Sequence, residues 1–108
     1  MVSYFQDTLV DVSPAINAAG FGNLTEVAVN NLFSTSNYTL IAVVTNFSSN
    51  ISFQLDGSID NVSFVPLATG TATGNGPVVI GISGRPVKWV RPRFVSGAGT
   101  VVFQLAAN

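Results

Sequence analysis

The chain has 108 residues, of which 47% are hydrophobic and only 8% are charged, against roughly 25% charged in an average soluble domain. It contains no cysteine and no histidine, which excludes disulfides, thiolate chemistry and the commonest general base. One domain is expected, and its net charge of −1 argues against the broad basic face of a general nucleic-acid binder.

The few charges are unevenly distributed along the chain. All five acidic residues lie within residues 1–60, and all four basic residues lie between Arg85 and Arg93. A surface with so few charges is poorly protected against association, so we expect a homo-oligomer. The alternative is a β-protein with a surface of Ser, Thr and Asn that is merely soluble. The first seven residues lack the basic region of a secretory signal, and the longest apolar run, 40–44, is too short to span a membrane.

Residues 1–23 are predicted to form an extended N-terminal arm. Its aromatic pair, Tyr4 and Phe5, is expected to be exposed and to bind a partner. Residues 9–12 could form a short strand, and residues 14–19 could form a single helical turn that Gly20 and Gly22 end. Because the arm is apolar and almost uncharged, we expect it to contribute to contacts outside its own domain.

The remainder, residues 24–108, is predicted to form one β-sandwich domain. Short runs with alternating or β-branched apolar residues are separated by clusters of Gly, Asn, Ser and Pro. With the short strand in the arm, the total is seven or eight strands, and this pattern is typical of an antiparallel β-sandwich or jelly roll. The strands are expected at 24–33, 38–47, 51–56, 63–67, 78–82, 87–94 and 100–105. The turns and loops are expected at 34–37, 48–50, 56–61, 68–77, 83–86 and 96–99.

The residues within these runs predict the position of several strands in the sheet and the side chains that point inward. The run 38–47 is the most apolar and is expected to be a central strand that is buried on both faces. Pro66 and Pro92 lack a backbone N–H, so their strands are expected at an edge or at a bulge. Val27 and Val29 are expected to point inward. The core is predicted to include Val43, Phe53, Leu55, Val79, Val90 and Phe103.

The stretch 51–67 is predicted to be a hairpin. Gly57 is assigned to its turn because glycine tolerates a positive φ. Asp56 and Asp60 have the spacing of calcium ligands, but Asn61 and Leu67 stand where a calcium loop has Gly and Glu. An Asx-rich turn is therefore expected, with no metal site and no acid–base pair, because water reaches a hairpin tip.

The run 87–94 holds the candidate binding residues. On a strand, Trp89, Arg91 and Arg93 share one face, and Lys88, Val90, Pro92 and Phe94 share the other. An aromatic ring beside two guanidinium groups suits the recognition of carboxylates, phosphates or sugars. The alternative is a solvated strand whose arginines pair with Asp56 or Asp60 of the same chain.

The second half of the chain resembles known proteins. It runs F-x-L-D-G-S-x-D-x-x-x-F-x-x-L, then a Gly/Thr-rich loop, then W-V-R-P-R-F, a glycine turn and V-x-F-x-L. This pattern is similar to small β-sandwich virion proteins of tailed bacterial viruses, which decorate or cement the head or form part of its fibres. It is more loosely similar to discoidin-like carbohydrate- and cell-surface-binding domains. Phe64 replaces the usual tryptophan of that group and the cysteine pair is absent, which favours the viral resemblance.

The viral resemblance implies a non-enzymatic structural protein that assembles in the host cytoplasm and is located in the virion. It implies binding to the major capsid protein or other virion proteins through protein–protein contacts, no cofactor, and a homo-oligomer, with a trimer as the expected form. The expected contact residues are Tyr4, Phe5, Trp89, Arg91 and Arg93. The alternative function is a carbohydrate-binding module or a receptor-binding domain at a fibre tip.

Overall fold

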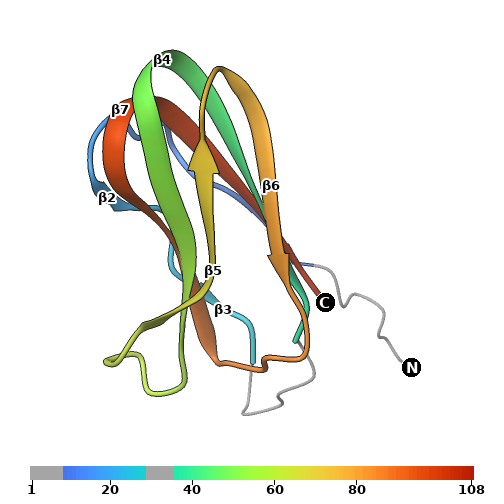
Figure 1. Ribbon diagram of the computed structural model, residues 1–108. Helices are drawn as coiled ribbons and strands as arrows, with labels where there is room; N and C mark the ends of the chain where they lie inside the picture. Colours follow the sequence, from blue (N-terminus) through green and yellow to red (C-terminus); the bar gives the residue numbers. More distant parts are fainter. Residues whose placement is uncertain (1–8, 29–35) are drawn as a thin grey trace.

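The computed structural model describes residues 9–28 and 36–108 (Figure 1). All its strand pairs are antiparallel, which confirms the predicted all-β antiparallel fold. No helix that could cross a membrane is found among these residues. The helical turn expected at 14–19 is wrong, because Ile16 forms a bridge with Val101 there. The strands are β1 (Leu9–Val12), β2 (Gly20–Phe21), β3 (Thr25–Glu26), β4 (Tyr38–Ser58), β5 (Val65–Ala72), β6 (Gly76–Ile82) and β7 (Trp89–Ala107).

Two long strands, β4 and β7, organise the sheet. Turns were expected within both, at 48–50 and 96–99, but each strand continues through that point as a bend. Ser49 pairs with Ala98, and the register shifts on both sides of this pair. Asn46, Gly97 and Gly99 have positive φ values of 53°, 116° and 150°. Glycine and asparagine adopt such values most readily, so these residues bend the paired strands together.

The bends fold the sheet into two layers (Figure 1). We call layer A the part made of β1, β6, residues 38–45 of β4 and residues 100–107 of β7. Layer B consists of β2, β3, β5, residues 51–58 of β4 and residues 89–96 of β7. The layers face each other: a Cβ on Gly70 of β5 would lie 2.7 Å from Ile80 Cγ2 of β6. The predicted sandwich is thus one sheet folded over.

The core lies between the two layers. Four predicted core residues, Phe53, Leu55, Val90 and Phe103, are at most 1% exposed. The prediction that Val79 lies in the core is wrong, because this residue is 61% exposed. Val78, Ile80 and Ile82 pack inward from β6 instead. The run 78–80 is apolar throughout, so its sequence does not indicate which face is inward.

The run 38–47 is central, as expected, because residues 38–44 pair with β6 on one side and β7 on the other. The prediction that both its faces are buried is wrong. Leu40, Ala42 and Val44 are buried, whereas Ile41 and Val43, on the alternate face, are only half-buried. The prediction that Val43 belongs to the core is therefore wrong as well. Val27, which directly follows β3, is buried as predicted. Val29 lies outside the described residues.

The described part of the predicted arm, residues 9–23, runs along β7. β1 pairs with residues 104–107, and β2 pairs with Phe94 and Arg93. Between them, the Ser13 N–H donates to the Phe103 carbonyl at 2.9 Å, and the Ser13 hydroxyl accepts from the Phe103 N–H at 3.0 Å. The segment therefore contributes a strand to each layer. Tyr4 and Phe5 lie outside the described residues.

The two prolines occupy different positions. Pro66 lies in β5, which pairs with β4 at the end of the sheet order, so the predicted edge strand is confirmed. Pro92 lies inside β7, which pairs on both sides, so the predicted edge position is wrong. Its carbonyl accepts from the Gly22 N–H at 2.9 Å. In an antiparallel ladder, the N–H and C=O of one residue point to the same neighbouring strand. The position at which Pro92 lacks an N–H therefore faces the gap in the chain between β2 and β3.

The predicted hairpin at 51–67 is confirmed, with its connection between Ser58 and Val65. Gly57, however, lies in β4 and not in the turn. A Cβ there would lie 2.7 Å from Leu67 Cδ1, so close packing, rather than a positive φ, requires glycine. The positive φ in the connection belongs to Asn61, at 62°. The loop expected at 68–77 is mostly strand, since β5 extends to Ala72 and β6 begins at Gly76.

Candidate functional site

The outer face of layer B carries the three predicted binding residues of β7. Trp89 and Arg91 are half-buried and Arg93 is exposed, while Val90, Pro92 and Phe94 are buried in between. The predicted sharing of one face is therefore confirmed for the three. We call this surface, together with Phe21 and Phe64, the cationic–aromatic face.

A guanidinium stacked between two rings forms the centre of this face. Arg91 Cζ lies 3.8 Å from the ring centroid of Phe21 and 4.0 Å from that of Phe64. Arg93 Cζ lies 5.6 Å from the Phe21 ring, on the same side of the sheet. Each such cation–π contact stabilises the arrangement by about 0.5–2 kcal/mol. The stack therefore holds Arg91 in a fixed position without neutralising its charge.

The stack leaves hydrogen-bond donors of Arg91 unsatisfied. A guanidinium group carries five N–H donors, and neither phenylalanine ring offers them a carbonyl, carboxylate or hydroxyl acceptor. Arg91 Nε is buried and has no hydrogen-bond partner among the described residues. A planar donor group fixed in this way matches the geometry of a carboxylate or phosphate acceptor.

Among the described residues, Asp56 and Asp60 form no ion pair with the arginines of this face. Asp56 is opposite Arg91 in the ladder and is 3% exposed, and it accepts a hydrogen bond from Gln54 Nε2. Within the described part of the chain, neither Arg91 nor Arg93 forms an ion pair with Asp56 or Asp60; the ion pair found there joins Lys88 Nζ and Glu26 Oε2 at 3.7 Å. The alternative that the arginines pair with these acids is therefore wrong.

Asp60 is occupied by its own turn. Its Oδ1 accepts hydrogen bonds from the Ser58 hydroxyl at 3.0 Å and from the N–H groups of Val62 and Ser63 at 2.9 and 2.8 Å. These bonds, led by the one from Ser63, lower the pKa of the Asp60 carboxyl below 3.8. The predicted Asx-rich turn is confirmed. Asp56 lies back in β4, and the described residues hold no cluster of three potential metal ligands.

Lys88 was assigned to the face opposite Trp89, but its ammonium group reaches the other side. Lys88 Nζ lies 4.9 Å from the centroid of the Trp89 ring while it pairs with Glu26. Glu26 is opposite Trp89 in the ladder. Lys88 precedes β7, so the alternation of side chains between the two faces of that strand does not determine the side on which its long side chain lies. One face of the Trp89 ring is thereby covered.

Phe21 and Phe64 were not among the predicted contact residues. Phe21 is 51% exposed and comes from β2, and Phe64 lies just before β5. Neither position has a local pattern that associates it with Arg91. The one available indication in the sequence is that Phe21 is a large aromatic residue between two glycines.

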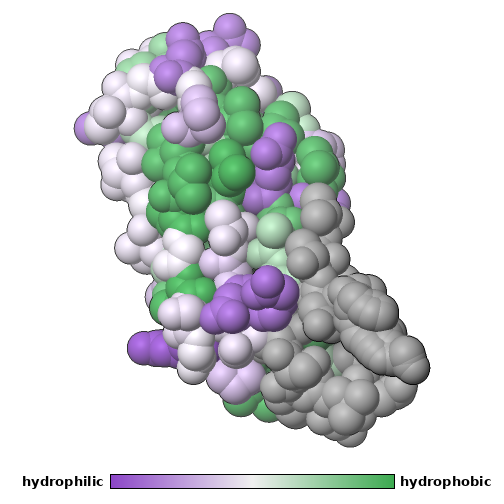
Figure 2. Space-filling view, turned by 90° about the vertical axis from the view of Figure 1, so that its right-hand side faces the viewer, coloured by the Kyte–Doolittle hydropathy of each residue, from purple (hydrophilic) through white to green (hydrophobic). Residues whose placement is uncertain are grey.

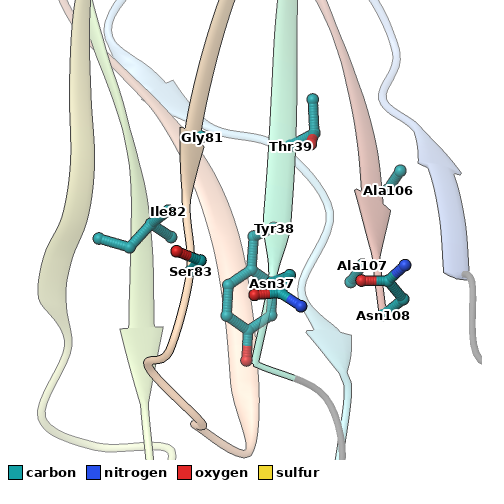
Figure 3. A pocket seen from close by; sticks show the side chains of 9 residues that line it. All are labelled: Asn37, Tyr38, Thr39, Gly81, Ile82, Ser83, Ala106, Ala107 and Asn108. Atoms are coloured by element: carbon teal, nitrogen blue, oxygen red, sulfur yellow. The ribbon is translucent and has the colours of Figure 1, made fainter.

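A separate pocket of about 370 Å³ lies where β4 begins and β7 ends (Figure 3). Its lining offers amide and hydroxyl groups, from Asn37, Asn108, Thr39 and Ser83. Its aromatic residue, Tyr38, is buried, and burial raises the pKa of the Tyr38 hydroxyl above 10.0. The hydroxyl accepts from the Val87 N–H at 3.4 Å, which partly opposes that shift. None of these groups is a strong nucleophile or a base at neutral pH.

Comparisons with known proteins show the fold. No family model and no curated protein sequence matches the chain. The SPBc2 prophage-derived protein YomS has a similar crystal structure, with a TM-score of 0.68 and 13% identity over 94% of each chain. A chain from the Bacillus endospore appendages, which form a novel family of disulfide-linked pili, has a TM-score of 0.48 and 11% identity, covering 93% of this chain and 85% of that one. At these identities, the similarity to YomS shows a shared fold alone.

Proposed function

We propose that this chain is a non-enzymatic structural protein of a bacteriophage particle, and that it decorates or cements the capsid. The similarity in fold to a prophage-derived protein over 94% of both chains supports a phage origin. The Phe21–Arg91–Phe64 stack carries the proposal of docking. It presents a fixed cation on an otherwise weakly charged surface.

In this proposal, the cationic–aromatic face binds acidic groups on a capsid protein. Arg93 is exposed and steers the approach to the shell, because exposed charges act mainly on association rate and are sensitive to salt. Arg91 is held in place before binding, so less side-chain entropy is lost when an acceptor meets it. Phe21, 51% exposed beside both arginines, supplies apolar contact area.

The proposal is tested by cosedimentation of the purified chain with empty shells of its source phage. Arg93→Ser is expected to weaken attachment about tenfold, and raised salt is expected to weaken the wild type in the same direction. Arg85→Ser is the matched control, since Arg85 is also exposed, loses the same charge and lies in the turn before β7. Arg85→Ser should bind as the wild type does.

A second variant separates charge from stacking. Arg91→Lys keeps the positive charge but removes the planar group that Phe21 and Phe64 enclose, so it should also weaken attachment. Equal loss in Arg85→Ser and Arg93→Ser would show that only overall charge matters and would contradict a specific face. No attachment of the wild type to shells would contradict the docking role altogether.

The alternative function, carbohydrate binding, requires an open aromatic platform. Trp89 is the best candidate for it, but Lys88 lies over its ring, and Tyr38 is buried in the core. These contacts favour docking to protein. A glycan array that gives a signal with the wild type and none with Trp89→Ala would establish the carbohydrate function instead.

A further inference from the structure

The outer face of layer A is apolar. Val79 of β6 and Val12 of β1 are 61% and 57% exposed. Between them on β4 and β7 lie Ile41, Val43 and Val102, which are half-buried because they flank one another in the ladder. Figure 2 looks at this side of the molecule and shows apolar residues gathered in a patch. We call these five residues the apolar face.

No charged side chain among the residues that the structure describes interrupts the apolar face. The other outward positions of the four strands, as far as the structure describes them, are Thr, Gln, Gly, Ala and Pro. Asp11 of β1 takes the alternate position, opposite Leu105, whose side chain is in the core. Arg91 and Arg93 belong to layer B, Lys88 directly precedes its residue Trp89, and Arg85 lies in the turn between β6 and β7. A charged partner would therefore find no complementary group on this face, whereas another flat, uncharged β-sheet face would fit it.

The size of the face matches a small protein–protein interface. Three strands of layer A contribute about seven residues each and β1 contributes four, so strand spacings of about 4.8 Å and a rise of about 3.3 Å per residue give a projected area of roughly 400 Å². The accessible area of a surface covered with side chains exceeds its projection, and each partner in a standard interface contributes about 800 Å². The largest apolar patch of a typical monomer covers about 300–600 Å² and often has a function.

We propose that the apolar face binds the apolar face of a second copy of this chain. Two sheets packed face to face interdigitate their side chains at a separation of about 10 Å. A surface that meets its own copy does so about a twofold axis, so the product is a dimer and not the trimer expected from the resemblance. The contact uses layer A alone, goes beyond the docking role and leaves the cationic–aromatic face of both copies free.

Sedimentation equilibrium of the full chain over a concentration series tests the proposal. The wild type is expected to be a dimer. Val79→Glu places one buried negative charge from each copy in the interface. This variant should raise the dissociation constant of the dimer about a hundredfold or more. Val65→Glu is the matched control, because Val65 is a strand residue of similar exposure, 55%, in layer B. That variant should dimerise as the wild type does.

A near-isosteric variant covers the case in which Val79→Glu does not fold. Val79→Thr keeps the shape and the strand preference of valine and replaces one methyl group by a hydroxyl, so it should weaken the dimer about tenfold. Val65→Thr again serves as its control. A wild type that stays monomeric at the highest soluble concentration would overturn the proposal and leave this face to a different protein. A dimer unaffected by both Val79 variants would overturn it as well.

Discussion

The ring of Phe53 packs against the ring of Phe103, with centroids 6.0 Å apart and planes tilted by 51°. The ladder partner of Phe103 is Ala42, on the same strand as Phe53. In a flat sheet the two rings would be roughly 36 Å apart, at about 3.3 Å per residue. The ring contact therefore exists only because β4 and β7 bend, and it joins the two layers at the centre of the core.

Phe103→Ala should lower the free energy of unfolding by about 3–5 kcal/mol, because it leaves a cavity beside Phe53 in a site that is 1% exposed. Urea unfolding followed by circular dichroism measures this change. Val65→Ala, which truncates a side chain that is 55% exposed and lies outside the apolar face, should cost less than about 0.5 kcal/mol. A loss below 1 kcal/mol for Phe103→Ala would be inconsistent with the two-layer core.

Gly97→Ala should destabilise the fold by roughly 2–4 kcal/mol. The residue has a φ of 116°, and a Cβ would lie 2.3 Å from the Asn50 carbonyl oxygen, where the bends of β4 and β7 meet. Gly74→Ala is the control, since a Cβ there meets nothing within 4 Å. Thermal melts of both variants distinguish the positions, and equal melting temperatures would show that close approach at the bend is unimportant.

Stability should decrease in alkaline solution because of Tyr38. Its pKa is raised above the ordinary value of 10.0, chiefly by burial, so the folded chain holds its proton more tightly than the unfolded chain. The stabilising contribution is complete below about pH 10 and is lost as the pH rises further. Urea midpoints from about pH 9 to about pH 11 should fall more steeply for the wild type than for Tyr38→Phe. Parallel slopes would contradict this assignment.

Much of the fold follows from local pattern. Alternation over 51–56 places Phe53 and Leu55 inward, because successive side chains of a strand point to opposite faces. The same alternation correctly places Trp89, Arg91 and Arg93 on one outer face, apart from the buried Val90. Asp60 and Asn61 form the expected turn, because their short polar side chains bond the nearby backbone. The strand class, the hairpin and three of the five residues of the cationic–aromatic face were thus determined by the sequence alone.

Only the tertiary structure decided the remainder. The glycines at 97 and 99 predict a chain reversal, but β4 pairs with β7 through that point, so the local turn tendency becomes a bend in a continuous strand. The run 78–80 has no polar residue to mark its outer face, so packing against β4 and the core determined that Val79 faces outward. Phe21, Phe64 and Arg91 come from separate parts of the chain, and β2, the β4–β5 connection and β7 bring them together. Contacts between residues distant in sequence have no local pattern, because the free energy of burial is gained only when the sheet has folded over.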